Sequence, residues 1–439
     1  MRTDTPINYK IVEEKLKLND IDNVGRSSIR EIKKLIDEIE QASGEKFIRM
    51  EMGIPGLPPS KVGVASEIKA LESGVASLYP DIRGIPALKE EMSLFVKNFL
   101  DIDVSAQSCI PTVGSMQGGF ACFLTLNRMY KEKNKTLFID PGFPVQKQQI
   151  RVLGQEYKTF DVYNYRGEKL RERLEEFLSQ GDIASIIYSN PNNPSWICFT
   201  DTELQIIGEL ANKYNVIVIE DLAYFAMDFR KDYSVPGEAP FQPTVAKYTD
   251  NWVMLISSSK AFSYAGQRIG MLVLSNKLFD MEAPDLLRFY KSANVGHTMI
   301  FETLYSLSSG TSHSAQYALA GILKAVNEGS YKFLDDVKEY GEKAKVMKKI
   351  FLDNGFNIVY DKDEDNPIAD GFYFTFSYPG FSGNDLLHSL VYYGISAISL
   401  SITGSERLEG IRACTSLISK DQFGDLEERL KIFNEHHKK

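Results

Sequence analysis

The sequence predicts an α/β protein with a parallel sheet between helices, followed by a smaller α+β region. Four short apolar runs rich in β-branched residues lie at 136–140, 183–189, 216–221 and 252–256, and helical patterns alternate with them. Strands of a parallel sheet are covered on both faces, so they appear as continuous apolar runs between helices. From about residue 300 helices dominate, and the alternating run at 371–376 predicts a strand of a second domain.

The composition is that of an ordinary globular protein and narrows the possible functions. The chain has 439 residues, enough for two domains, with 43% hydrophobic and 25% charged residues. The formal net charge is −9, and the densest basic run, 131–135, is typical of a solvated loop, so we expect no nucleic-acid partner. No apolar run is long enough to cross a membrane, so we expect no membrane span.

Cysteine and histidine usage predicts a metal-free cytoplasmic protein. The four cysteines lack CxxC spacing and are expected to be reduced thiols. The five histidines are scattered apart from the adjacent pair His436–His437, and they form no pattern for a metal site. The N-terminus is polar and charged, so no signal peptide is predicted and the cytoplasm is the expected location.

The first 50 residues are predicted to form a polar arm and one helix that packs with the C-terminal domain. Ser28 and Glu31 have the spacing of a capping box, and apolar residues then recur at helical spacing up to about Gly44. The predicted domain limits are 1–50, 51–300 for a large domain and 301–439 for a small α+β domain.

Three turns rich in glycine, proline or serine follow. The first, 53–59, is either a connector or a place where a ligand approaches the main chain. The second, 79–86, precedes an amphipathic helix whose first position suits Pro86. The third, 111–119, leads into an apolar helix predicted at 120–130. Free N–H groups at such a helix N-terminus suit a phosphate, although many helices begin in this way.

Residues that can take part in chemistry follow the predicted strands. The carboxyl ends of parallel strands meet at one edge of the sheet, where α/β proteins bind ligands. Each residue also has a structural explanation: a helix cap, a core aromatic ring or an Asn-Pro turn. Five such residues at strand ends nevertheless favour a site. They are Phe143, Asn193, Asp221, Tyr224 and Lys260.

The stretch Ser257–Arg268 carries the strongest chemical signal. It joins a serine cluster, Lys260 and Arg268 at the end of a predicted strand. A buried lysine amine can attack a carbonyl, and hydroxyl and guanidinium groups suit a phosphate. Together these groups describe a site for pyridoxal 5′-phosphate, an aldehyde that carries a phosphate ester. The alternative is a polar loop in which Lys260 is solvated.

The ordered set resembles the class I/II aminotransferases of the aspartate aminotransferase superfamily, which are fold-type-I pyridoxal-phosphate enzymes. The resemblance begins near Gly53 and extends to the C-terminus. It implies a large domain with a mainly parallel seven-stranded sheet, a smaller α+β domain and a homodimer with shared active sites. The implied activity moves an amino group from an L-amino acid to a 2-oxo acid by a ping-pong mechanism. The motif order consists of Asp221, Tyr224, Lys260, Arg268 and Arg412.

The resemblance also implies a role for individual residues. Lys260 would hold the cofactor covalently and move the substrate proton, Asp221 would pair with the ring nitrogen, and Tyr224 would donate to the ring oxygen. The other implied cofactor-binding residues are Ser115, Met116, Phe143, Asn193, Ser257, Arg268 and, from the neighbouring subunit, Tyr79.

The resemblance implies that Arg412 and the backbone of Gly53 bind the substrate α-carboxylate. Asn193, a donor to the ring oxygen like Tyr224, would also bind the substrate. The run 410–414 is a predicted short strand with Arg412 in its middle. Without the resemblance, this pattern favours a surface arginine on an edge strand.

Arg83 is a candidate for selecting acidic substrates, because the resemblance places its loop at the dimer interface near the neighbouring active site. An arginine offers a fixed fork of donors to a second carboxylate. The favoured alternative is an exposed arginine paired with Asp81 or Glu90, an arrangement that contributes little energy.

Two segments depart from the family pattern. The family usually has Asn-Pro-Thr-Gly where this chain has Asn-Pro-Ser-Trp at 193–196. Because tryptophan does not readily adopt the positive φ of glycine, we expect a different local turn, with Trp196 narrowing the pocket. The segment 292–314 lacks the family's usual pattern, so its contacts with the substrate side chain are not predicted.

Two alternatives to a transaminase are considered. A related pyridoxal-phosphate lyase, such as a C–S lyase or an aminocyclopropane-carboxylate-synthase-like enzyme, would use the same cofactor-binding residues. A regulator that senses the cofactor would join such a domain to a winged helix. Only about 50 residues precede Gly53, and they show one clear helix and no basic excess, so the regulator is disfavoured.

Overall fold

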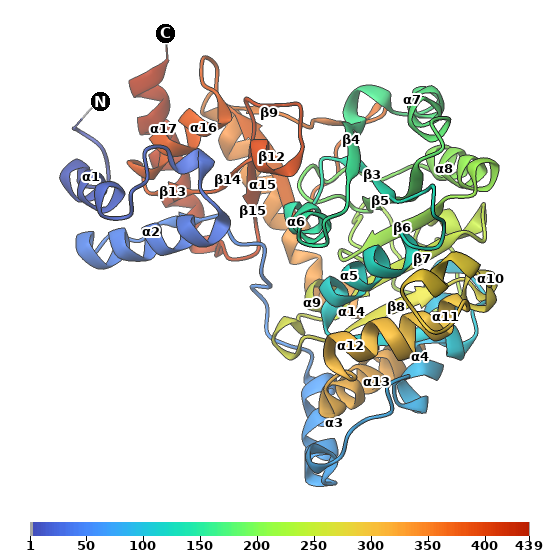
Figure 1. Ribbon diagram of the computed structural model, residues 1–439. Coiled ribbons are helices and arrows are strands. Elements are labelled where there is room, and N and C mark those ends of the chain that lie inside the picture. The colour runs from blue at the N-terminus through green and yellow to red at the C-terminus, as the bar shows by residue number, and fades with distance from the viewer. Residues whose placement is uncertain (1–2, 439) are drawn as a thin grey trace. The chain divides into compact units, whose positions relative to one another are not determined.

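The computed structural model describes residues 3–438, and contacts between residues divide the chain into two compact units, each with its own sheet and core (Figure 1). The predicted boundary near residue 300 falls inside the large unit, and the sequence-based domain limits stay a prediction. The large unit comprises Leu57–Asn192 and Cys198–Val337, and the small unit comprises the chain up to Gly56, the segment Asn193–Ile197 and the chain from Lys338 onward.

A seven-stranded sheet forms the centre of the large unit. Its strands are β2 (Cys109–Thr112), β3 (Lys135–Asp140), β4 (Tyr157–Asp161), β5 (Ile183–Ser189), β6 (Ile217–Leu222), β7 (Trp252–Ser257) and β8 (Gly270–Leu274). Their order is β2-β8-β7-β6-β5-β3-β4. Strand β8 runs opposite to the other six strands of this sheet, so the predicted mainly parallel seven-stranded sheet is confirmed.

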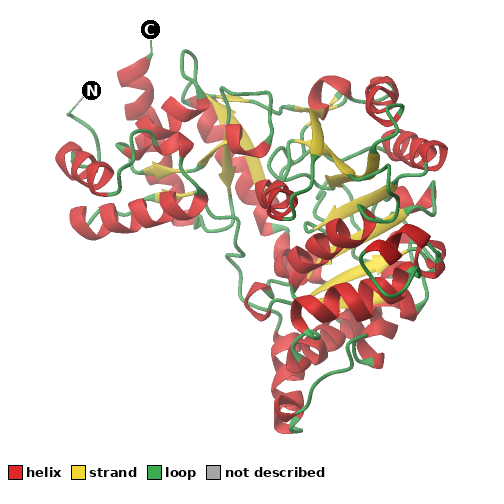
Figure 2. Ribbon diagram, viewed as in Figure 1, coloured by secondary structure: helices red, strands yellow, loops and turns green. Residues whose placement is uncertain are grey.

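Burial explains which strands were predictable. Every residue of β5, β6 and β7 is buried, as expected for strands covered on both faces. Strand β4, which lies at an edge, was not predicted, because Tyr157, Lys158 and Thr159 are polar and partly or fully exposed and therefore form no apolar run. Figure 2 shows the helices around the strands of this sheet.

The helices of the large unit differ from the predictions mainly at their ends. Pro86 is the first residue of its helix, as predicted. The helix predicted from residue 120 begins at Gly114, because the glycine- and serine-containing turn is itself helical. The segment 292–314 contains a π-helical turn at Thr298–Leu304. The helices are α3 (Lys61–Glu72), α4 (Pro86–Leu100), α5 (Gly114–Leu126), α6 (Pro144–Val152), α7 (Lys169–Leu178), α8 (Asp201–Tyr214), α9 (Ser258–Ala261), α10 (Asn276–Asp280), α11 (Val295–His297), α12 (Tyr305–Ser308), α13 (His313–Asn327) and α14 (Phe333–Val337).

The small unit contains a four-stranded antiparallel sheet of order β14-β15-β12-β9. These strands are β9 (Asn357–Ile358), β12 (Tyr373–Ser377), β14 (Ile398–Ser399) and β15 (Ile411–Cys414). A parallel pair, β1 (Ile48–Arg49) and β13 (Ile395–Ser396), joins the N-terminal segment to this unit. The helices are α1 (Tyr9–Leu18), α2 (Ile29–Ser43), α15 (Glu339–Asp353), α16 (Gly383–Val391) and α17 (Phe423–His437).

The N-terminal helices share the core of the small unit. The predicted capping box is present, and α2 ends at Gly44 with a φ of 76°. The predicted polar arm contains a second helix, α1, whose buried residues Val12 and Leu16 belong to the same hydrophobic cluster as Leu386 and Phe433. Too few apolar residues lie in α1 for the sequence alone to indicate it.

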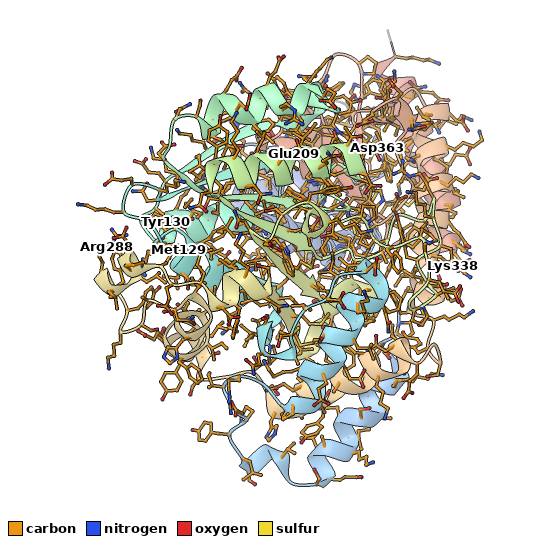
Figure 3. All side chains as sticks on the ribbon, turned by 90° about the vertical axis from the view of Figure 1, so that its right-hand side faces the viewer. Met129, Tyr130, Glu209, Arg288, Lys338 and Asp363 are labelled. Atoms are coloured by element: carbon orange, nitrogen blue, oxygen red, sulfur yellow. The ribbon has the colours of Figure 1, made fainter. Side chains whose placement is uncertain are left out.

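The segment just after α5 adjoins the surface of the large unit. Figure 3 shows Met129, which is buried, and Tyr130, which is partly exposed, near Arg288, whose guanidinium donates to the carbonyl of Arg128 (3.1 Å). The basic run 131–135 that follows is an exposed loop up to the start of β3, as predicted.

Candidate active site

A buried carboxylate lies near the end of β6, the central strand of the large sheet. Asp221 accepts hydrogen bonds from Nε2 of Gln146 on α6 (2.8 Å) and from the backbone N–H of Ala223 (3.1 Å). Burial raises the pKa of Asp221 to about 6, although these two hydrogen bonds and the charge of Lys260 lower it. Pairing with a cation would relieve this cost of burial, so Asp221 is suited to bind one.

The adjacent carboxylate, Glu220, belongs to the core instead. Successive side chains of a strand point to opposite faces. Glu220 accepts hydrogen bonds from the hydroxyl groups of Tyr188 (2.9 Å) and Thr244 (2.5 Å). Burial raises the pKa of Glu220 to about 7 against these hydrogen bonds. Its partners are buried hydroxyl groups on the other side of the sheet, so Asp221 is the candidate of the two.

Lys260 lies just past the end of β7, the strand next to β6. The parallel register pairs Asp221 with Leu255, so these two strand ends lie side by side. The side chain of Ser257 accepts from the backbone N–H of Ser259 (3.1 Å) and caps the short helix α9. This turn carries the partly exposed side chain of Lys260 to the carboxyl edge of the sheet.

The sheet topology brings a third segment to the same edge. Gly270, at the start of antiparallel β8, lies opposite Thr112 at the end of β2 and opposite Ser257 at the end of β7. The N-terminus of α5 follows β2 directly, so it lies beside the start of β8.

Four residues pack closely at this point, and we call them the cofactor cradle: Gly114, Ser115, Arg268 and Gly270. A Cβ on Gly114 would lie 2.5 Å from the guanidinium of Arg268, and a Cβ on Gly270 would lie 2.9 Å from the backbone nitrogen of Ser115. Gly114 also has a φ of 66°, which favours glycine. The cradle therefore requires both glycines, and it joins an arginine to the N–H groups of a helix N-terminus.

The other residues predicted to bind the cofactor occupy different environments in the large unit. Phe143 is partly buried at the N-cap position of α6, and Tyr224 is buried just after β6. The carbonyl of Met116 accepts from Nε2 of Gln149 (3.0 Å). Tyr79, the residue predicted to reach the neighbouring subunit, is 93% exposed.

In the small unit, the three residues predicted to bind the substrate lie together, and we call them the carboxylate clamp (Gly53, Asn193 and Arg412). One terminal nitrogen of Arg412 donates to the carbonyl of Glu51 (2.6 Å), two residues before Gly53. The other donates to Oδ1 of Asn193 (3.4 Å). Within residues 3–438, the buried Nε of Arg412 has no hydrogen-bond partner.

The interpretation of Arg412 as a surface arginine on an edge strand is wrong. Strand β15 pairs with β14 on one side and with β12 on the other, and Arg412 is only 3% exposed. Burying a guanidinium is costly unless it is paired. The burial of Arg412 therefore indicates that a positive charge is needed in this part of the small unit.

The expectation that Trp196 avoids a positive φ is also wrong. Trp196 has a φ of 65° and is fully buried. The left-handed conformation costs an L-residue roughly 1–2 kcal/mol. A Cβ on Gly371 would lie 2.0 Å from the indole, which shows how closely the ring packs there. Burial of the indole offsets the backbone strain, so the tryptophan occupies the conformation expected of the family's glycine.

Arg83 forms the surface pair that the sequence favoured. Its guanidinium donates to both carboxylate oxygens of Asp81, with distances of 2.6–3.2 Å, and both side chains are exposed. A salt bridge of this kind holds the arginine within its own loop.

Sequence reasoning missed Gln146, which orients Asp221. The only signal was its place two residues after Pro144, a residue that suits the first position of a helix.

The groups of the large unit fit pyridoxal phosphate. The cradle offers an arginine and helix N–H groups where a Cβ would otherwise lie, which suits the phosphate. Asp221 offers a buried negative charge for a protonated ring nitrogen, and Lys260 offers an amine at the same sheet edge.

Comparisons with known proteins agree with this fit. The family model described as aminotransferase class I and II matches residues 45–363. The chain is similar to a probable aspartate aminotransferase of Methanocaldococcus jannaschii, 24% identical over 361 residues that cover 75% of this chain and 86% of that protein. It is also similar to an LL-diaminopimelate aminotransferase of Dehalococcoides mccartyi, 29% identical over 282 residues that cover 62% and 67% of the two chains.

Solved structures show the same fold. An alanine aminotransferase from Pyrococcus furiosus has a TM-score of 0.75 at 17% identity and covers 94% of this chain and 98% of that one. An aspartate aminotransferase from Thermus thermophilus with maleate has a TM-score of 0.72 at 16% identity, with coverages of 92% and 96%.

Two features are absent from the described part of the chain. None of its helices has the length and apolar character needed to span a membrane. The same residues contain no group of three or more His, Cys, Asp or Glu side chains arranged to hold a metal ion.

Proposed function

The chain belongs to the class I and II aminotransferase family, and on that premise we propose that it moves an amino group from an L-amino acid to a 2-oxo acid by a ping-pong mechanism. The family's cofactor is pyridoxal 5′-phosphate. The observation that carries the proposal is the meeting of Asp221, Lys260 and the cofactor cradle at one sheet edge.

Asp221 would hold a proton on the ring nitrogen of the cofactor. Pyridoxal phosphate, when bound, supplies a ring that accepts the electrons released at the substrate Cα. A buried carboxylate stabilises the positive charge that this role requires, and the hydrogen bond from Gln146 keeps the carboxylate in one orientation. Ser115, Met116, Phe143, Asn193, Ser257 and Arg268 would hold the remainder of the cofactor.

Lys260 and Tyr224 would complete the catalytic set. The Nζ of Lys260 would hold the cofactor and, once released by the substrate, take the proton from the substrate Cα. The hydroxyl group of Tyr224 would donate a hydrogen bond to the ring oxygen of the cofactor. Both residues follow strands that end beside each other, β7 and β6.

The carboxylate clamp would bind the α-carboxylate that every amino acid carries. The guanidinium of Arg412 is already held by the carbonyl of Glu51 and by Asn193, so little freedom is lost when a carboxylate binds. The substrate side chain would be chosen elsewhere, and the named relatives act on different amino acids.

We also propose a homodimer in which Tyr79 reaches the partner's active site. The large unit exposes several large apolar side chains, which a second copy would cover. The test is sedimentation, in which Leu78→Glu should reduce the mass from that of two 49.6 kDa chains to that of one. A monomer before substitution would overturn this arrangement. The exposed residues are Ile68, Leu71, Leu78, Tyr79, Tyr305 and Tyr317.

We propose a cytoplasmic location, supported by the cysteines. Cys109, Cys122, Cys198 and Cys414 are all free and buried. Free thiols persist in reducing compartments. Cell fractionation that recovers the activity outside the cytoplasm would contradict the proposal.

Replacing Lys260 tests the proposed function. The purified protein should be yellow, and Lys260→Ala should remove both the colour and turnover, because no other amine would hold the cofactor. Lys277→Ala, at an exposed lysine of α10, is the matched control and should retain both. Unimpaired transamination by Lys260→Ala would overturn the proposal. Release of the amino group as free ammonia, with no transfer to a 2-oxo acid, would favour the lyase.

A further inference from the structure

Tyr373 contacts Arg412 through the face of its ring. Strands β12 and β15 form an antiparallel pair, in which Tyr373 lies opposite Cys414 and Thr375 lies opposite Arg412. Side chains two apart on a strand share a face, so Tyr373 and Arg412 are diagonal neighbours. The guanidinium carbon lies 4.4 Å from the ring centroid, which is the geometry of a cation–π contact. The ring therefore supports the plane of the guanidinium.

The other end of Tyr373 lies against Gly53. A Cβ on Gly53 would lie 2.0 Å from the tyrosine hydroxyl oxygen and 3.1 Å from the ring carbon that bears it. No side chain fits there unless the tyrosine moves. This contact explains why position 53 requires a glycine. It also joins the loop of Gly53 to the strand that supports Arg412.

Trp196 holds the third side of the tyrosine. Its ring meets that of Tyr373 edge-on, with centroids 6.2 Å apart and an interplanar angle of 73°. Trp196 follows Asn193 by three residues, so the same packing anchors the segment that brings Asn193 to Arg412. Edge-to-face aromatic pairs are favourable beyond their burial alone. All three members of the carboxylate clamp are thus linked to one tyrosine.

We propose that Tyr373 is the positioning residue of the carboxylate clamp and that Trp196 keeps it in place. The ring fixes the plane of Arg412, and the hydroxyl fixes the loop at Gly53. The proposal rests on the clamp's proposed role with the substrate α-carboxylate. Loss of the ring should weaken the binding of every α-amino acid, whatever its side chain, and should affect KM more than kcat.

Two amines that cannot be transaminated, because neither has a Cα proton, test the proposal in the holoenzyme. 2-Aminoisobutyrate carries an α-carboxylate but no Cα proton, and tert-butylamine has a methyl group in place of that carboxylate. Titration is followed by the absorbance of the bound cofactor. Tyr373→Leu should raise the Kd of 2-aminoisobutyrate about 10-fold, or about 1.4 kcal/mol, and change that of tert-butylamine less than about 2-fold. Equal weakening of both amines, or no change in either, would overturn the proposal.

A compensating pair of substitutions provides a second test that does not depend on the leucine variant folding. Gly53→Ala should weaken 2-aminoisobutyrate, because its methyl group meets the tyrosine hydroxyl. Adding Tyr373→Phe removes that oxygen, so the double variant should regain the affinity of Tyr373→Phe alone. Failure of the second substitution to rescue the first would overturn the assignment. An unsubstituted holoenzyme that takes neither amine would instead overturn the proposed function.

Discussion

The cofactor cradle and the carboxylate clamp recognise anionic groups by different means. The cradle, in the large unit, combines the N-terminus of α5 with Arg268, and both Gly114 and Arg268 have positive φ angles. It consists of turns at the ends of strands. The clamp, in the small unit, places Arg412 in the middle of an interior strand and supports it with aromatic rings.

This difference shows that burial decides whether water or protein groups must stabilise the charge of an arginine. Arg268 is exposed, so water solvates its charge, and a hydrogen bond to the carbonyl of Ala265 (2.9 Å) holds its guanidinium. Arg412 is buried, so its charge must be paired through a backbone carbonyl, an amide and a ring. We therefore expect substitutions near the clamp to affect stability and substrate binding together. Substitutions in the large unit's site should affect mainly cofactor chemistry.

Among substitutions that distinguish the two sites, Asp221→Asn in the large unit should have the largest effect on kcat. An amide cannot hold a proton on the ring nitrogen by charge, so kcat should fall about 1000-fold, a loss of about 4 kcal/mol. The cofactor should still bind through the cradle and Lys260. Steady-state kinetics and the cofactor absorbance measure the two quantities separately. A kcat close to that of the unsubstituted enzyme would show that Asp221 is only structural.

The same variant has a pH-dependent signature in the cofactor-free protein. The pKa of Asp221 is raised from 3.8 to about 6 in the folded chain, mainly by burial. Because the folded chain holds this proton more tightly, Asp221 contributes most to the free energy of unfolding below pH 4. That contribution is lost as the pH rises through 6. At pH 8, Asp221→Asn should therefore unfold with a free energy about 2–3 kcal/mol higher than the unsubstituted protein. Denaturant titrations should show the difference disappearing towards pH 4.

Arg412→Ala should weaken substrate binding by the carboxylate clamp without changing cofactor binding by the cradle. It removes the charged partner of the substrate carboxylate, so kcat/KM should fall about 150-fold for every amino donor, or about 3 kcal/mol. Arg412→Lys keeps the charge but loses the fork of donors, and should recover only part of the activity. Cofactor affinity, measured by absorbance, should not change in either variant. Equal KM values before and after substitution would exclude the clamp role.

Trp196→Gly tests whether burial or backbone conformation dominates near the clamp. Removing a buried indole costs about 3–5 kcal/mol, and relief of the positive φ returns about 1–2 kcal/mol. The free energy of unfolding should therefore fall by about 2 kcal/mol. Trp252, buried in β7 and without a positive φ, is the matched control, and Trp252→Gly should cost more. Greater stability of Trp196→Gly would show that strain outweighs packing.

The smallest effect is expected from Arg83→Met. Because Arg83 pairs with Asp81 at the surface, its loss should change kcat/KM less than about 2-fold for acidic and apolar donors alike. A selective loss of about 10-fold or more for aspartate or glutamate would return Arg83 to the substrate site.

The fold of the large unit was predictable to a greater extent than that of the small unit. Buried parallel strands such as β5 and β6 leave continuous apolar runs, and their carboxyl ends carry residues such as Asp221. Edge strand β4 and the first helix, α1, were missed because their sequences are polar. Gln146 was missed because its importance comes from its hydrogen bond to a residue far along the chain.

By itself the sequence determined which side chains follow the ends of the parallel strands, because strand direction and alternation are local properties of the chain. Only the tertiary structure decided the surroundings of Arg412 and Trp196. Pattern alone put Arg412 on an edge and Trp196 in another turn, whereas both are buried against Tyr373. The physical reason is that burial energy comes from contacts between segments distant in sequence, and here it outweighs both the cost of desolvating a charge and that of a left-handed backbone.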